Sequence, residues 1–174
     1  MKKVEPFGPI YDEIERRLRA EFGDKPDIQQ DVPRFGEVKK LPAFFIEMVD
    51  IDPLPPPGTG EIELTTRWEI RILISPKQER PKIVARNASA RLGTIFNDKV
   101  LVPDLCHPAT YQGASDDNFD LKVPLYESWV NNLEIKIRVG ENDWDTWEFY
   151  QENLEYDEYL NREFEREKEV SDET

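Results

Sequence analysis

The side chains best suited to covalent or metal chemistry are Cys106 and His107, the one cysteine and the one histidine among 174 residues. A cysteine or serine nucleophile usually needs a histidine base, and a zinc site needs several His or Cys ligands at short spacing. Neighbouring residues of a strand point to opposite faces, so this pair does not have the expected geometry of either site. We therefore expect no catalytic residue, no metal site and no bound cofactor, and we interpret His107 as an ordinary loop histidine.

The carboxylates are plentiful, but most of them fall on faces that we expect to be solvated. The chain has no G-x-S-x-G motif, no phosphate-binding loop and no dinucleotide fingerprint. The order Asp143-Trp144-Asp145 lacks the rest of an EF-hand loop. The sequence therefore favours a structural or binding role, with a small enzyme or ligand-binding module near Cys106 and His107 as the alternative.

The formal net charge of −14 is concentrated at the C-terminal end. Residues 141–174 hold 14 acidic and 3 basic side chains, whereas residues 1–140 are nearly neutral. Because a non-specific nucleic-acid binder needs the opposite sign, we expect no direct contact with DNA or RNA. No apolar run has the length of a signal peptide or a membrane-spanning helix, so we expect no membrane partner and a location in the cytoplasm or in a particle assembled there.

The stretch 60–75, GEIELTTRWEIRILIS, predicts the central strand of a sheet. Apolar residues and Thr66 occupy the even positions from Ile62 to Ile74, and charged residues and Thr65 occupy the odd positions from Glu61 to Arg71. Strict alternation predicts one buried face and one solvated face. The charges on the solvated face either form cross-strand ion pairs or belong to a subunit interface, where Arg67, Glu69 and Arg71 would set the register.

The other elements are expected to pack on or beside this strand. Apolar spacing predicts one helix over 9–22 and a second over 81–96, the second with a stripe of Ile83, Val84, Asn87, Ala88, Arg91, Leu92, Ile95 and Phe96. We expect strands over 41–49 and 125–139, shorter ones near 28–32 and 99–102, irregular chain over 103–122, and a bulge at Asn131–Asn132. This order predicts an α+β fold, with a mostly antiparallel sheet and helices packed on one face.

Two further segments are candidates for contacts with a partner. Residues 50–60, DIDPLPPPGTG, contain four prolines and two glycines, so we expect a stiff, protruding loop rather than a strand. That loop is either a plain connector or a contact loop. The acidic extension 141–174 is rich in aromatic residues, and part of it has helical spacing; it either folds on its own body, docks on another subunit or stays flexible. The candidate interaction residues are Pro53, Leu54, Pro55, Pro56, Arg67, Glu69, Arg71, Trp144, Trp147, Tyr150 and Leu154.

The order of these segments over residues 8–140 resembles that of phage tail terminator proteins of the lambda-like kind, and is most similar to the versions in Mu-like prophages and contractile-tailed phages. The matching features are Leu41-Pro42-Ala43, the strand 60–75 with Thr66-Arg67-Trp68-Glu69 at its centre, the helix 81–97 and the strand around 129–139. The acidic extension is longer than we expect for this family, which leaves its contacts open. The predicted organisation is thus a body over 1–140 and an acidic C-terminal extension over 141–174.

The resemblance implies a structural virion protein that forms a hexameric ring. Such a ring caps the tail tube, ends tail polymerisation and forms the surface joined to the head–neck connector. The implied partners are further copies of the chain, the tail tube protein, the connector protein and, in contractile tails, the sheath protein. The implied location is the tail–neck region of the virion, assembled in the host bacterial cytoplasm. A related neck or tail-completion protein is the alternative within this class.

Overall fold

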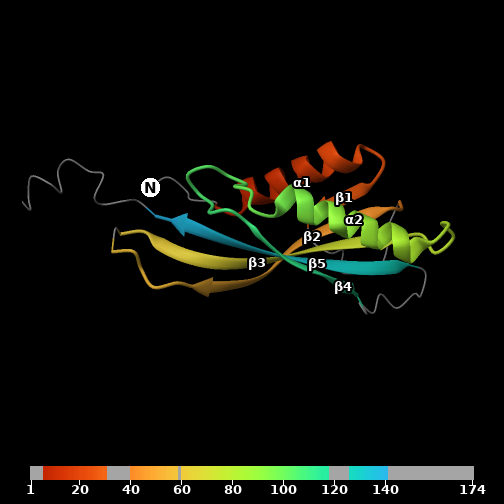
Figure 1. The fold of residues 1–174 in the computed structure, drawn as a ribbon. Helices are drawn as coiled ribbons and strands as arrows, with labels where there is room; N and C mark the ends of the chain where they lie inside the picture. Colours follow the sequence, from red (N-terminus) through yellow and green to blue (C-terminus); the bar gives the residue numbers. More distant parts are fainter. Residues whose placement is uncertain (1–5, 31–39, 59, 118–125, 141–174) are drawn as a thin grey trace, which may run out of the picture.

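A computed structural model describes residues 6–30, 40–58, 60–117 and 126–140 of the chain. Its elements in chain order are α1 (Gly8–Phe22), β1 (Asp27–Gln30), β2 (Ala43–Pro53), β3 (Ile62–Ile74), α2 (Pro81–Phe96), β4 (Thr110–Asp116) and β5 (Glu127–Val139). The five strands form one sheet in the order β1-β2-β3-β5-β4, and only β1 and β2 are parallel. Both helices cover the same face (Figure 1), which confirms the predicted α+β fold with helices on one side.

β3 is the central strand, as the alternation predicted. It pairs with β2 on one side and with β5 along its whole length on the other. Its even positions Trp68, Ile70 and Ile72 are fully buried beneath the helices. Ile10, Ile14 and Leu18 of α1 pack against them in the main core. We refer below to the helix-covered face and, on the other side of the sheet, to the open face.

Each helix begins and ends where the sequence predicts. Pro9 lies in the first turn of α1, where a missing N–H costs nothing. Gly23 ends α1 at φ 74°, a conformation that favours glycine, and its N–H donates to the Arg19 carbonyl over 2.8 Å. α2 likewise starts at Pro81.

The buried stripe of α2 differs from the predicted one. Ala85, Ser89, Leu92 and Phe96 are buried, while Ile83, Asn87 and Arg91 are exposed. The small residues Ala85 and Ser89 turn toward the sheet because they allow the helix backbone to approach it closely. Of the predicted stripe, Leu92 and Phe96 are buried and Val84, Ala88 and Ile95 pack against the core, so the prediction was wrong only for Ile83, Asn87 and Arg91.

Three segments differ from the predicted strand pattern. β2 continues through Asp50 to Pro53, where we expected a loop. The Leu54 N–H donates to the Glu63 carbonyl of β3, so the backbone nitrogen of the preceding residue, Pro53, faces the outer edge of β2. Proline is tolerated at such an edge because its nitrogen has no hydrogen to donate. Residues 99–102 form only an isolated bridge at Lys99, and β4 occupies part of the segment expected to be irregular.

The bulge expected at Asn131–Asn132 lies instead in the neighbouring strand β4, between Tyr111 and Gly113. Asn131 is fully buried and has a different role. Its amide donates to the Ile70 carbonyl over 3.0 Å, and its side-chain oxygen accepts a hydrogen bond from the Tyr111 hydroxyl over 2.9 Å. Asn131 thus links β5 to β3 and β4 at the centre of the sheet.

A second polar link lies under α1. The Trp68 indole N–H donates to the Thr66 hydroxyl over 2.8 Å, and that hydroxyl donates to the Ile135 carbonyl over 2.8 Å. Tyr11 meets the Trp68 ring edge to face, with ring centroids 4.7 Å apart. One hydroxyl therefore satisfies two groups that are buried beneath a helix.

Replacing Thr66 with Val should lower the free energy of unfolding by about 1–3 kcal/mol, because the Trp68 indole N–H then stays buried without an acceptor. Thr65→Val is the matched control, since Thr65 is also buried but its hydroxyl makes no hydrogen bond within the described residues. Urea unfolding of both variants measures the difference. Equal losses in the two variants would show that the Thr66 hydroxyl contributes nothing specific.

Candidate interaction surfaces

The long strands extend past the helices at one end of the sheet. β3 has 13 residues and rises ~40 Å at ~3.3 Å per residue. α2 has 16 residues and rises only ~24 Å at ~1.5 Å per residue, and α1 is one residue shorter. The β2–β3 hairpin and the end of β5 therefore project beyond the helices (Figure 1). We call this region the projecting end.

The projecting end leaves apolar side chains in solvent. Val49, Ile51 and Ile62 are 45%, 41% and 51% exposed. Ile51 pairs with Thr66 and Ile62 with Val139, so both belong to the helix-covered face, where no helix reaches them. Sequence reasoning placed Ile62 on the buried face and did not select Val49 or Ile51. The different rises of strand and helix were the signal that could have found them.

The proline segment follows directly from this end. Pro53 is the last residue of β2, and residues 54–58 lead toward β3 with Pro55 and Pro56 exposed and Leu54 partly buried. Gly58 and Gly60 have φ of 80° and 84°, which lets the chain turn back. The predicted contact residues Pro53 to Pro56 therefore lie beside the exposed isoleucines.

The open face carries a ladder of ion pairs across β2 and β3. Arg67 reaches Asp50 at 2.7 Å and Asp52 at 2.8 Å. Arg71 reaches Glu47 at 2.6 Å and also contacts Glu69. The candidate residues Arg67, Glu69 and Arg71 are thus brought onto one face and paired within the chain. This is the cross-strand pairing that the alternation allowed. The exposed pairs of Arg67 contribute little to stability, whereas the Arg71 side chain is largely buried.

The ladder ends at a small apolar cluster on the same face. Ala43, Phe45 and Leu73 are almost completely buried, with Leu41 and Tyr126 packed against them. The open face is therefore solvated and charged in its middle but closed at the end opposite the projecting end. The alternation of β3 did not predict this second cluster.

Cys106 and His107 cap the edge of β5 beyond β4. His107 donates its N–H to the Lys136 carbonyl over 2.8 Å, and Arg138 donates its own to the Leu105 carbonyl over 2.9 Å. A shallow hollow of about 160 Å³ lies beside them. Burial raises the pKa of the Cys106 thiol, which disfavours the reactive thiolate at neutral pH. The His107 ring nitrogen Nε2 lies 3.8 Å from Glu63.

Within the described residues, no group of three His, Cys, Asp or Glu side chains is arranged to hold a metal ion. Among the same residues, no helix combines the length and the apolar character needed to cross a membrane. The candidate residues Trp144, Trp147, Tyr150 and Leu154 lie outside the described residues, as does the proposed boundary at 141.

Comparisons with known proteins add little to this geometry. No protein-family model and no curated protein matches the chain. Among solved structures, it is similar to a chain of the virion of a native gene transfer agent particle, at 13% identity and a TM-score of 0.44. The match covers 75% of this chain and 90% of that one. A likeness this weak carries no argument about function, and the proposals below rest on the sequence pattern and the surfaces.

The Glu63 carboxyl beside the projecting end allows a prediction about pH dependence. A hydrogen bond from Arg138 holds the pKa of Glu63 below its ordinary value of 4.5, with a smaller effect from Lys136. Arg138→Met should therefore raise the Glu63 pKa more than Lys136→Met does, as carboxyl titration by NMR would measure. Because the folded pKa is lowered, the stabilisation is present above pH 4.5 and is lost as the pH falls through the lowered pKa. Equal shifts in the two variants would contradict this assignment.

Proposed function

We propose that the chain is a structural virion protein of the tail terminator kind rather than an enzyme. In this role it forms a closed ring, hexameric by the family resemblance, that caps the tail tube and ends its polymerisation. The ring then presents its other side to the head–neck connector and, in a contractile tail, holds the last sheath ring. Its place is the tail–neck region of a virion assembled in the bacterial cytoplasm.

The observation that carries this proposal is the projecting end of the sheet. Protein surfaces rarely keep several large apolar side chains in solvent beside a stiff loop without a partner, and such patches mark interaction sites. Ile51 and Ile62 lie on strands rather than on a flexible loop, so the surface is held rigidly. The outer edge of β2 past Ile46 has no partner strand among the described residues, which leaves a further surface for assembly.

The charged ladder supports the same reading. Arg67 is half exposed although it forms two ion pairs, so its guanidinium remains accessible to a neighbouring surface. Paired charges at an interface set register and exclude wrong partners more than they add affinity. The open face therefore fits a contact that must be specific and made in one orientation.

Substitution at the projecting end tests the proposal. The double variant Ile51→Asn, Ile62→Asn should stay folded with only a modest loss of stability, because both residues are about half exposed. It should co-sediment with purified tail tubes much less than the parent chain does, since the apolar contact is lost.

The control for this experiment is Ile83→Asn on α2. Ile83 is 47% exposed but lies away from the projecting end. Tube binding that falls equally in both variants would remove the projecting end as the contact surface. A parent chain that binds the head–neck connector but not the tube would favour the neck or tail-completion role instead.

A further inference from the structure

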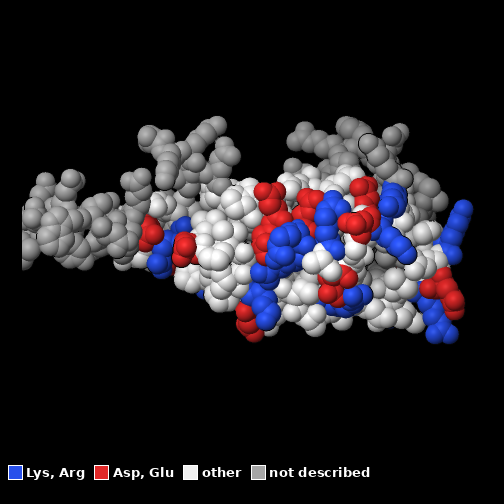
Figure 2. Space-filling model, turned by 90° about the horizontal axis from the view of Figure 1, so that it is seen from above, with Lys and Arg blue, Asp and Glu red and all other residues white. Residues whose placement is uncertain are grey.

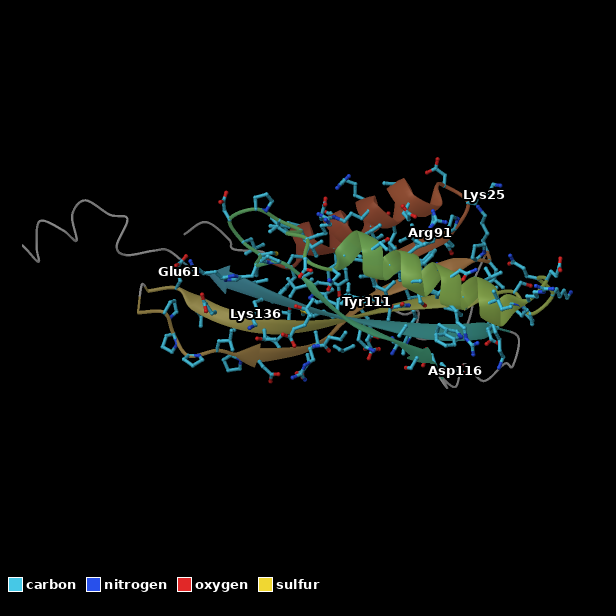
Figure 3. The ribbon with its side chains drawn as sticks, viewed as in Figure 1. Lys25, Glu61, Arg91, Tyr111, Asp116 and Lys136 are labelled. Atoms are coloured by element: carbon cyan, nitrogen blue, oxygen red, sulfur yellow. The ribbon has the colours of Figure 1, made fainter. Side chains whose placement is uncertain are left out.

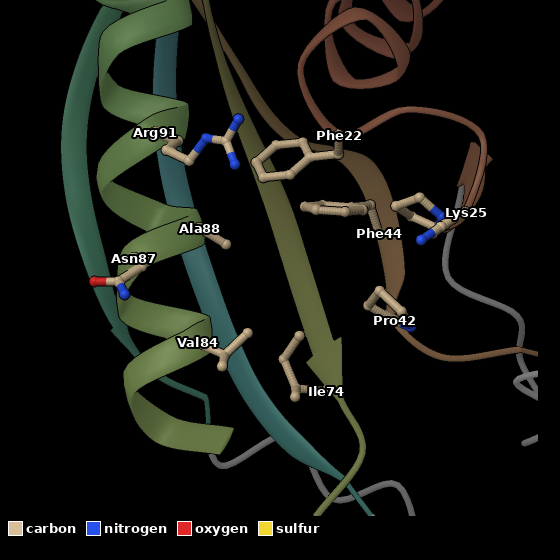
Figure 4. Close-up of a pocket in the computed structure, with 10 residues that line it drawn as sticks. Phe22, Lys25, Pro42, Phe44, Ile74, Val84, Asn87, Ala88 and Arg91 are labelled. Carbon is tan, nitrogen blue, oxygen red and sulfur yellow. The ribbon is translucent and has the colours of Figure 1, made fainter. Parts of the chain in front are cut away.

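A groove on the helix-covered side lies between the C-terminal end of α1, the first half of α2 and the sheet. It encloses about 330 Å³ and lies open to solvent. Its walls are mostly apolar, from Phe22, Phe44, Ile74, Val84 and Ala88. Figure 4 shows these side chains directed toward one another from the two helices and the strands. The groove has the size and character to take an apolar or aromatic side chain.

Basic side chains border the groove. Lys25 and Arg91 line it, and the Arg91 guanidinium lies 5.0 Å from the centre of the Phe22 ring while also pairing with Glu21. The turn before α2 adds the exposed basic residues Lys77 and Arg80 and the acidic Glu79. Lys82 and Arg86 instead turn toward β5, where Lys82 pairs with Glu127 and Arg86 lies over the Trp129 ring. In Figure 2, charges of both signs are interspersed over the helices. An apolar slot with this border suits an aromatic residue in an acidic segment.

The chain itself contains such a segment. Residues 141–160 hold eight acidic side chains and no basic one, together with Trp144, Trp147 and Tyr150. Aromatic residues are favoured anchors for buried pockets at interfaces, and the acidic neighbours complement the basic border. Neither the groove nor this segment is used by the proposed contact with the tail tube.

The distance along the sheet decides which copy of the segment fits. Gly140 follows β5 beside the start of β3, whereas Ile74 in the groove is at the other end of β3, ~40 Å away. Figure 3 likewise shows Glu61, at the start of the long strand, far from Lys25 and Arg91, which line the groove. Trp144 and Trp147 lie four and seven residues past Gly140. A fully extended chain carries them only ~14 and ~25 Å, too short to reach their own groove.

We propose that this groove binds the aromatic residues Trp144 and Trp147 of a second copy of the chain. The contact joins the projecting end of one copy to the groove at the opposite end of the sheet in the next copy. Because it uses two different surfaces, it is head-to-tail and can close into a ring. This inference deepens the proposed function, because it identifies the contact by which neighbouring subunits would hold one another.

A labelled peptide of residues 141–156 tests the contact on the full-length chain. The recipient is the full-length variant Trp144→Ala, Trp147→Ala, whose own segment no longer competes for the groove. Fluorescence anisotropy should show saturable binding that weakens from about 0.05 to about 0.5 M NaCl, because salt screens the charged border. Ala88→Glu within the groove and the exposed change Lys25→Glu should each weaken binding at least about tenfold, or about 1.4 kcal/mol.

The matched control is a peptide of the same composition in scrambled order. Equal binding of the scrambled peptide would show charge attraction alone and would overturn the inference. No binding at low salt would also overturn it. A parent chain that caps tail tubes but fails to bind the peptide would refute the groove contact while leaving the proposed function intact, so the two failures can be told apart.

Discussion

The difference in rise between a strand and a helix determines the shape of this protein. A residue adds ~3.3 Å to a strand but ~1.5 Å to a helix, so helices of similar residue count cover only part of the sheet. The uncovered part is the projecting end, where Ile51 and Ile62 are exposed. The covered part holds the core around Trp68 and also the apolar groove. The two candidate contact surfaces thus lie at opposite ends of one rigid sheet.

A rigid sheet with different surfaces at its two ends is suited to head-to-tail assembly. Such contacts use two unlike patches, and they close into a ring when the rotation between neighbours allows it. The Asn131 and Thr66 hydrogen bonds join β3, β5 and β4, so these strands keep a fixed relation along the sheet. The ion pairs of the open face lie between these ends, where they can set orientation without supplying most of the binding energy.

The sequence predicted the elements whose pattern is local. The period-2 alternation of β3 and the proline and glycine at the ends of α1 were sufficient to place those elements closely. Sequence reasoning failed where pairing between strands decides the structure. The segment TYQGASD has few strand-forming residues, yet it forms β4 because the edge of β5 is free to pair with it. β2 continues to Pro53 because that residue faces an outer edge. The ion pairs of Arg67 and Arg71 were anticipated as a class, but their partners depended on the register of β2. The groove joins residues far apart in the chain, so no local pattern could reveal it.

Negative-stain imaging of purified tail tubes with and without the full-length chain tests the central claim most directly. The account predicts ring-shaped density at one end of each tube and no further growth of tubes that carry it. Tubes with bare ends and unchanged growth over a range of salt concentrations, in the presence of folded chain, would contradict the assignment of this protein to the tail end.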